Sequence, residues 1–163
     1  MGLLCTGLLC LGLLVGSFLN VVIYRLPVMM EVRWRRDCCE LLELEPEKQE
    51  APLNLATPNS HCPHCKTPIK AWQNIPVLSY LMLGGKCGHC AAPISVRYPI
   101  VEMVTGLMTL ALAWFFSFSP ALLGAVLLTW ALIALTLIDV DHQLLPDDIT
   151  LPLMWLGLLF NVQ

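Results

Sequence analysis

The sequence LLCTGLLCLGLLVGSFLNVVI, residues 3–23, contains no charged residue and decides the class of fold. A helix rises about 1.5 Å per residue, so about 20 apolar residues cross the ~30 Å hydrocarbon core of a bilayer. Two further apolar stretches occupy residues 99–118 and 121–138, and a shorter one runs from residue 149 to residue 163. We therefore expect an all-α integral membrane protein, with transmembrane helix 1 in residues 1–26 and further membrane helices in residues 99–163.

The composition agrees with a chain whose partner is the lipid bilayer. Of its 163 residues, 57% are hydrophobic and 13% are charged, and the formal net charge is −3. In soluble domains about a quarter of the residues are charged, so the composition argues against a water-soluble enzyme. The apolar content excludes a disordered chain. The net negative charge also argues against nucleic acid as a partner, because binding it requires an excess of basic residues.

The basic residues predict the orientation of the chain. All nine Lys and Arg residues lie from Arg25 to Arg97, and no other loop contains one. The positive-inside rule places this segment in the cytoplasm and the N-terminus on the periplasmic side. No basic residue precedes the first apolar stretch, which is unlike a cleavable signal peptide. With alternating helices, the turn at residues 117–120 is external and Asp139 returns to the cytoplasmic side.

Residues 27–98 form the expected cytoplasmic loop. Its first half, residues 31–59, carries most of the acids of the chain: Glu31, Asp37, Glu40, Glu43, Glu45, Glu47 and Glu50. We interpret this half as a solvated connector. The alternative is a short amphipathic helix with Leu41, Leu42 and Leu44 on its apolar side. No internal repeat is evident in the sequence.

The second half of the loop contains two CxxC pairs, in residues 62–65 and 87–90. Two such turns complete a tetrahedral four-cysteine site, and cytosolic thiols stay reduced and available for a metal. We predict a small zinc-ribbon-like domain with a structural Zn²⁺, because a four-cysteine site has no open position. The predicted ligands are Cys62, Cys65, Cys87 and Cys90. Two alternatives are that His64 or His89 replaces a cysteine, or that the pairs exchange disulfides.

Four carboxylates follow the third apolar stretch, in the sequence LIDVDHQLLPDDIT of residues 137–150. Asp139 comes directly after that stretch, so we expect its carboxyl to be partly desolvated and suited to acid–base chemistry. Asp141 is two residues away and points to the other side of a helix, so the two do not pair. Glu102 is the other acid at membrane depth, and it could pair with Asp139 or bind Arg97.

Asp141, Asp147 and Asp148 are candidate supporting residues or simply solvated acids of a membrane-exit loop. Asp147 also stands where a following helix would begin, and carboxylates are favoured there. In the first apolar stretch, Gly12 and Gly16 are four residues apart, with Asn20 one turn further on. This spacing predicts a close contact between two helices and a hydrogen bond from Asn20 across it.

Several stretches together carry a family resemblance. They are GSFLNVVIYRLP (16–27), AWQNIP (71–76) between the CxxC pairs, ISVRYP (94–99) leading to Glu102, and LIDVDHQLLPD (137–147). The chain resembles the bacterial prepilin peptidases, also called type IV leader peptidases. The resemblance implies an aspartic endopeptidase of the cell inner membrane that serves type IV pilus assembly and type II secretion. Its substrates would be prepilins and pseudopilins, cut at the cytoplasmic face behind a basic leader.

The resemblance also implies the site residues and cofactors. The first catalytic aspartate of the family maps onto Asp139, and its zinc-binding cysteines map onto the four cysteines of the CxxC pairs. Residues 99–163 would begin the peptidase membrane domain. Many members methylate the new N-terminus with S-adenosylmethionine. No glycine-rich nucleotide-binding motif is present, so this cofactor is assigned by the resemblance alone. Acids of the connector, or Asp147 and Asp148, are expected to receive the basic leader.

One departure from the family pattern bears on activity. The second catalytic aspartate of the family lies in a Gly-x-Gly-Asp motif on a later helix, and that motif does not occur in these 163 residues. We therefore expect a truncated chain with little or no peptidase activity by itself. A catalytically dead zinc protein that acts in pilus or secretion-system assembly is the alternative. A membrane thiol oxidoreductase is a third hypothesis. The sequence assigns no oligomeric state.

Overall fold

The computed structural model describes residues 2–44, 54–117 and 119–161. The connector acids Glu45, Glu47 and Glu50 and the turn residue Phe118 lie outside the described residues. In the described part, the secondary structure is helical with two isolated bridges. The helices are α1 (Gly2–Leu41), the 3₁₀ helix η1 (Ala71–Asn74), α2 (Leu78–Met82), α3 (Arg97–Phe116), α4 (Pro120–His142) and α5 (Asp147–Asn161). The predicted all-α fold is confirmed.

Three helices, α1, α3 and α4, are long and apolar enough to cross a membrane. Each contains all or most of one of the three long apolar stretches of the sequence. Helix α5 has 15 residues and begins at Asp147. Asp147 and Asp148 lie in its first turn, where carboxylates face the positive end of the helix dipole, as predicted for Asp147.

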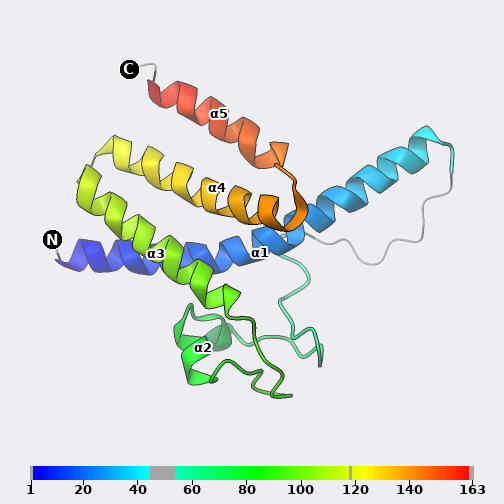
Figure 1. Ribbon diagram of the computed structural model, residues 1–163, viewed down its shortest axis with the longest axis horizontal. Helices are drawn as coiled ribbons and strands as arrows, with labels where there is room; N and C mark the ends of the chain where they lie inside the picture. The colour runs from blue at the N-terminus through cyan, green and yellow to red at the C-terminus, as the bar shows by residue number, and fades with distance from the viewer. Residues whose placement is uncertain (1, 45–53, 118, 162–163) are drawn as a thin grey trace.

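Helix α1 does not end where its apolar stretch ends. It runs for 40 residues, through Pro27, to Leu41. Residues 31–41 are almost all exposed, as expected of a solvated connector, but they continue α1 as helix. The alternative of a short separate amphipathic helix is wrong in its extent, because α1 ends at Leu41 and Leu42 and Leu44 lie beyond it, exposed. A proline inside a helix costs about 3 kcal/mol, but Leu26, Pro27 and Met30 are buried here and offset that cost. Figure 1 shows the end of α1 projecting beyond the other helices.

The contact between α1 and α3 depends on two glycines. A Cβ on Gly12 would lie 2.8 Å from Gly106 Cα, and one on Gly16 would lie 2.7 Å from Glu102 Cα. Real Cβ atoms do not approach backbone so closely, so only glycine lets the helices meet here. Asn20 donates a hydrogen bond to the carbonyl of Tyr98 at 3.2 Å. The predicted close contact and the predicted interhelical hydrogen bond are both confirmed.

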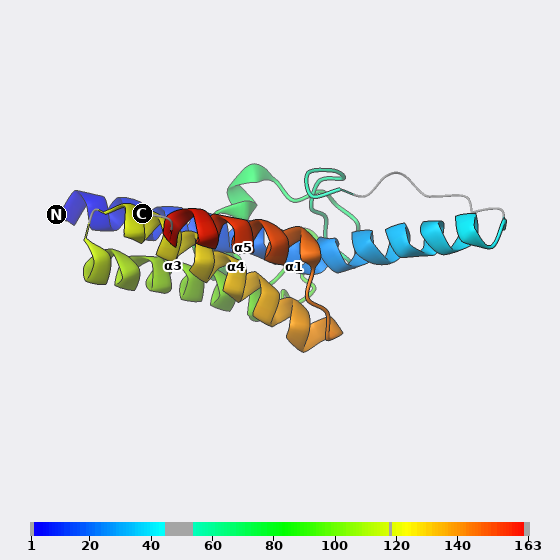
Figure 2. The ribbon, with the colours of Figure 1, turned by 90° about the horizontal axis from the view of Figure 1, so that it is seen from above.

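Helices α3, α4 and α5 run alternately back and forth (Figures 1 and 2). Helices α3 and α4 pack against α1, and α5 lies against α4 on the side away from α1. Trp130 of α4 donates a hydrogen bond to Thr109 Oγ1 of α3 at 2.9 Å. The buried core combines α1, α3 and α4 and consists of Leu19, Val22, Ile23, Leu26, Met30, Val101, Ala134 and Ile138. This arrangement brings the four-cysteine loop, the start of α3, the end of α4 and the start of α5 to one end of the bundle.

Candidate functional site

The two CxxC pairs lie in turns with the same backbone hydrogen bonds. The Cys62 N–H donates to the Thr67 carbonyl at 3.0 Å, and the Cys87 N–H donates to the Ala92 carbonyl at 2.8 Å. Each turn is closed by a bridge, His61 with Pro68 and Lys86 with Pro93. The sequences HCPHCKTPI (61–69) and KCGHCAAPI (86–94) are therefore a structural repeat, which the sequence analysis missed.

In each turn, the residue that follows the second cysteine has a strained backbone conformation. Lys66 and Ala91 have φ values of 55° and 56°, in the left-handed region. Their N–H groups donate to the carbonyls of Cys62 and Cys87 at 2.8 and 3.0 Å. Non-glycine residues adopt this conformation only when the surrounding structure holds them. The turns are thus built to point both thiols of a pair in one direction.

All four thiol groups converge. The Sγ atoms of Cys62, Cys65, Cys87 and Cys90 lie within 4.8 Å of one another, and those of Cys62 and Cys90 are 3.8 Å apart. Ideal tetrahedral coordination with Zn–S bonds of about 2.3 Å separates the sulfurs by about 3.8 Å. The cluster can hold a metal ion, and its four sulfur donors fit Zn²⁺. His64 and His89 do not belong to this group.

The surroundings shift the pKa values of three of the thiols, and not all in the same direction. Hydrogen bonding to the Thr67 side chain and backbone lowers the pKa of Cys65 to about 6, and the Thr67 Oγ1 lies 3.3 Å from Cys65 Sγ. Backbone hydrogen bonds from Cys90 and His89 lower the pKa of Cys87. A backbone hydrogen bond from Ala92 lowers the pKa of Cys90, but burial and the neighbouring thiols outweigh it and raise that pKa to about 11. The cluster therefore offers thiolates to a metal at neutral pH.

Two acids, at the end of α4 and the start of α5, have partners that the sequence did not assign. Arg97 donates two hydrogen bonds to Asp141, at 2.9 and 2.6 Å, so the Arg97–Glu102 pair, one of the two alternatives for Glu102, is not formed. Asp148 lies 3.4 Å from the Arg33 guanidinium, and both side chains of this ion pair are exposed to solvent. These contacts join the start of α3 to the end of α4, and α1 to the start of α5.

Glu102 is buried in α3 at 8% exposure and faces the four-cysteine loop. Its Oε2 accepts a hydrogen bond from the Val77 N–H at 2.8 Å, and the Ser17 hydroxyl also donates to its carboxylate. Neither Asp139 nor Arg97 is its partner, so both predicted alternatives for Glu102 are wrong. Glu102 is a residue of α3, so these two hydrogen bonds connect α3 to the loop at Val77 and to α1 at Ser17.

Asp139 is exposed, whereas partial desolvation was expected. The preceding residue, Ile138, is fully buried against α1. Successive helical residues are rotated by about 100°, so the Asp139 side chain leaves this contact. Within the described residues, its carboxylate makes no hydrogen bond or ion pair. Asp139 and Glu102 are not brought together as a carboxylate pair.

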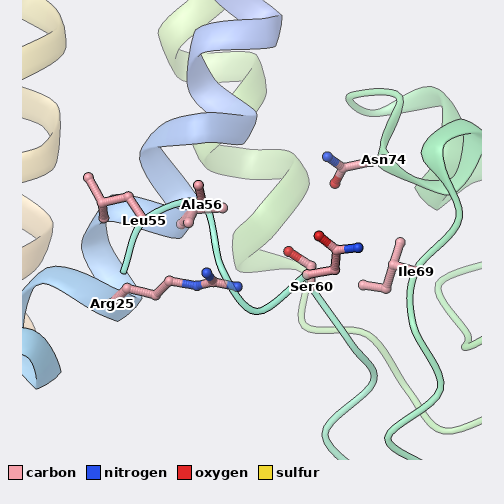
Figure 3. Close-up of a pocket in the computed structure, with 8 residues that line it drawn as sticks. Arg25, Leu55, Ala56, Ser60, Ile69 and Asn74 are labelled. Atoms are coloured by element: carbon pink, nitrogen blue, oxygen red, sulfur yellow. The ribbon is translucent and has the colours of Figure 1, made fainter. Parts of the chain in front are cut away.

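Arg25 is a site residue that the sequence analysis used only for orientation. It is buried at 8% exposure. Its guanidinium donates to the carbonyls of Asn54 and Pro58 at 2.9 and 2.7 Å. Figure 3 shows this side chain reaching from α1 beneath the loop, at a cavity of about 210 Å³ lined also by Ser60 and Asn74. The position of Arg25 in the sequence RLP, close after an apolar stretch, could have marked it as a site residue.

A larger cavity of about 530 Å³ adjoins this one and shares Arg25 in its wall. It lies between α1, the four-cysteine loop and the start of α3. Glu102 and Asn20 line it from the helices, and Tyr80 and Gln73 line it from the loop. A cavity of this size is within the ~300–1,000 Å³ range of small-molecule sites.

Two family models match the chain. Residues 10–116 match the bacterial peptidase A24 N-terminal domain, and residues 126–163 match the type IV leader peptidase family. The four cysteines, Arg25 and Glu102 lie in the first match, and Asp139 lies in the second.

Curated relatives carry one shared description, prepilin leader peptidase/N-methyltransferase. The relative from Pseudomonas aeruginosa is 56% identical over 158 residues, which is 97% of this chain and 54% of the relative. The relative from Neisseria gonorrhoeae is 55% identical, over 93% of this chain and 53% of its own length. The one from Legionella pneumophila is 52% identical over the same shares. The chain thus spans about half the length of the curated relatives it matches. No solved structure matches it.

Proposed function

This chain belongs to the bacterial peptidase A24 family, and we propose that it supplies one catalytic carboxylate and the zinc domain of a membrane aspartic endopeptidase. The enzyme cleaves the basic leader of type IV prepilins and pseudopilins at the cytoplasmic face of the inner membrane, and it methylates the new N-terminus. The observation that carries the proposal is 56% identity, over 97% of this chain, to a relative described as a prepilin leader peptidase/N-methyltransferase.

The arrangement of the helices supports the proposed orientation. The four-cysteine loop and the end of α4 lie at the same end of the bundle (Figure 1). The Arg97–Asp141 ion pair joins the end of α4 to the start of α3, which directly follows the loop. All nine basic residues belong to residues 25–97, so the positive-inside rule puts this end in the cytoplasm. The N-terminus is then periplasmic, and Asp139 is at the cytoplasmic face, where a prepilin leader is accessible.

Asp139 takes the role of one of two catalytic carboxylates. In a two-carboxylate mechanism, one carboxylate removes a proton from water as the water oxygen attacks the peptide carbonyl carbon. The other, protonated, hydrogen-bonds the carbonyl oxygen, and the departing amine then receives a proton. The second carboxylate is not supplied by Glu102, which is engaged by Val77. By family resemblance it belongs to a Gly-x-Gly-Asp motif outside these 163 residues, so we expect the chain alone to be inactive.

The zinc site has a structural role in this proposal. Four protein sulfurs complete the coordination of Zn²⁺ and leave no position for water or substrate. Cys62, Cys65, Cys87 and Cys90 would hold the ion, which fixes a loop too small to build an apolar core. For the second activity, S-adenosylmethionine supplies the methyl group that the new N-terminal amine accepts.

The basic leader of the substrate needs acids near the cleavage site. Asp147 is exposed beside the end of α4, and Asp148 is held only by the exposed ion pair with Arg33. The projecting part of α1 also presents exposed acids, among them Glu31 and Asp37. These two groups are proposed to receive the leader, while the basic residues of the loop repel it.

A chimera tests the proposed function. Residues 1–163 are joined to the remaining half of the Pseudomonas aeruginosa relative and assayed for prepilin cleavage in membranes. Asp139→Asn should abolish cleavage, and Cys38→Ser, which changes an exposed cysteine of α1 outside the four-cysteine cluster, is the control that should keep it. Cleavage that persists in the Asp139→Asn chimera would contradict the proposal. A chimera that folds, binds zinc and never cleaves would favour the assembly role of a catalytically dead protein.

A further inference from the structure

The segment between the two cysteine turns is apolar and exposed. Residues 71–85, with the sequence AWQNIPVLSYLMLGG, contain no charged residue. They include helix α2, which has no buried residue. Three of its side chains are 58%, 67% and 77% exposed, and we call them the α2 patch: Leu78, Leu81 and Met82. Large apolar side chains grouped on a protein surface mark a contact with a partner or a membrane.

The α2 patch occupies one side of its helix, because residues three and four apart lie on the same face. Ser79 and Tyr80 lie on the other side, where they are partly buried and line the 530 Å³ cavity. Helix α2 therefore packs against the protein with one side and presents apolar side chains to the surroundings with the other.

Hydrogen bonds to one carboxylate fix the depth of α2 along the bundle. Val77, the residue before α2, donates its N–H to Glu102 Oε2 at 2.8 Å, and the Ser17 hydroxyl donates to the same carboxylate. Ser17 lies inside the uncharged stretch of residues 3–23, about 9 Å before its end. The start of α2 therefore lies beside the membrane-spanning part of α1 and not beyond it. Figure 1 shows α2 beside the first residues of α3.

The bond to Val77 also fixes the direction of α2. Val77 has a φ of 59°, a conformation that a β-branched residue adopts only when neighbouring groups impose it. The Glu102 carboxylate imposes it by binding the Val77 N–H. Turning the α2 patch inward would rotate this N–H away from Glu102, so the patch is held facing outward.

The surface of α3 at the same depth faces lipid. Helix α3 is long and apolar enough to cross a membrane. Ile100 and Met103, on either side of Glu102 in the sequence, are 54% and 47% exposed. Since Glu102 also sets the level of α2, the α2 patch lies at the level of this lipid-facing surface.

Charged and aromatic residues at the ends of the segment suit a membrane surface. Lys70 and Lys86 flank residues 71–85, and both are exposed. A lysine lays its apolar stem along hydrocarbon while its ammonium group stays among the headgroups, where anionic lipids attract it. Trp72 is 47% exposed, and tryptophan is enriched at membrane–water interfaces.

We propose that residues 71–85 insert into the adjacent membrane leaflet, with the α2 patch among the acyl chains and Lys70 and Lys86 at the headgroup phosphates. Residues 75–77 are neither helix nor strand, and their backbone polar groups need water or protein partners. The segment therefore lies at the boundary of headgroups and acyl chains, not at the bilayer centre. In the proposed orientation this leaflet is the cytoplasmic one, and the four-cysteine loop is anchored to it.

Photo-crosslinking tests this contact in the zinc-loaded chain, reconstituted in vesicles of phosphatidylethanolamine and phosphatidylglycerol. The photoreactive residue p-benzoylphenylalanine replaces Leu81, and the matched control carries it at Leu41, which is 83% exposed on the projecting end of α1. Position 81 should crosslink phospholipid about tenfold more than position 41, because only position 81 is placed among acyl chains. Zinc content verifies that both variants fold.

A second measurement needs no variant. Hydroxyl radicals generated in water oxidise the methionines that water reaches. Met82 is 77% exposed by the protein and Met108, in the middle of α3, is 49% exposed. If lipid covers both, Met82 should be oxidised in the vesicles at a rate within about threefold of that of Met108. Oxidation of Met82 about tenfold faster than that of Met108 would overturn the proposal.

The crosslinking experiment also identifies other occupants of the α2 patch. Crosslinks from position 81 to a second copy of the chain, or to prepilin in vesicles that contain it, in place of lipid would overturn the proposal. So would lipid crosslinking at position 81 no greater than at position 41. Neither measurement depends on cleavage, so its result is independent of the chimera experiment.

Discussion

Arg97 holds Asp141 through two parallel hydrogen bonds, of 2.9 and 2.6 Å, and so ties the first turn of α3 to the last turn of α4. A guanidinium and a carboxylate fit each other in this bidentate geometry, which restricts both side chains. Asp139 is on the same turn of α4 as Asp141. The ion pair therefore limits the movement of the helix end that carries the proposed catalytic carboxylate.

Removing this ion pair should destabilise the protein measurably. We expect Arg97→Gln to lower the free energy of unfolding by about 1 kcal/mol, because the pair is only partly exposed and bidentate. Arg97→Lys should not restore it, since an ammonium group cannot make both bonds. Unfolding in detergent with rising denaturant gives the comparison. Arg35→Gln is the control: its pair with Glu31 is exposed at 71% and 59%, and we expect a loss below about 0.5 kcal/mol.

The glycine contact between α1 and α3 should not tolerate a methyl group. In Gly16→Ala the new Cβ would lie 2.7 Å from Glu102 Cα, and separating the helices should cost about 1–3 kcal/mol. Gly7→Ala is the matched control on the same helix, because nothing lies within 4 Å of its Cβ position. The two variants are compared by denaturant unfolding. Equal stability would show that the helices do not meet at Gly16.

Zinc removal should destabilise the loop and leave the stability of the membrane helices unchanged. Chelation is expected to make residues 54–96 more susceptible to protease while α1 and α3 stay protected, since the glycine contact does not involve the metal. The intact protein should contain one zinc per chain. Cys62→Ser should lose the metal, and Cys38→Ser, an exposed cysteine outside the cluster, should keep it. Retention of one zinc by Cys62→Ser would contradict the four-cysteine site.

Cys65 and Cys90 should differ in their reactivity with pH once zinc is removed. Only the thiolate is alkylated, and a lowered pKa means that the thiolate appears at lower pH. Cys65, with a pKa of about 6, should react with iodoacetamide from about pH 6 upward, whereas Cys90, with a pKa of about 11, should react last. Mass spectrometry of the alkylated peptides reports the order.

The Thr67 hydroxyl causes part of this difference. Thr67→Val removes it with little change in volume, so the pKa of Cys65 should rise and its alkylation should need a higher pH. Thr57→Val is the control, because Thr57 lies in the same loop outside the four-cysteine turns. Identical pH profiles for Cys65 with and without the Thr67 hydroxyl would assign the lowered pKa to another cause.

Much of the fold was predictable because its signals are local. An uncharged stretch long enough to cross a bilayer has few alternatives to a membrane helix, so α1, α3 and α4 follow from the sequence. Gly12, Gly16 and Asn20 predicted the helix contact because residues three to four apart share one helix face. The cysteine spacing predicted the thiol cluster for a similar reason, since the residues of a CxxC turn have little freedom.

The partners of the charged residues were not predictable in this way. Several acids were expected at the same membrane surface as Arg97. The sequence does not say which helix ends meet there, so it does not select a partner for Arg97. The continuation of α1 past Pro27 was also missed, because the apolar stretch ends before it and the compensating burial of Met30 comes from packing. The repeat of the two cysteine turns is carried by backbone hydrogen bonds more than by residue identities.

The sequence by itself therefore determined a membrane chain of apolar helices, a four-thiol cluster and one glycine-mediated helix contact. Each depends on residue type and short spacing along a single element. Only the tertiary structure decided that Arg97 binds Asp141, that Glu102 receives the Val77 N–H, and that Arg25 faces a cavity beneath the loop. Electrostatic and hydrogen-bond partners depend on where distant segments meet, and that is set by the packing of the whole molecule.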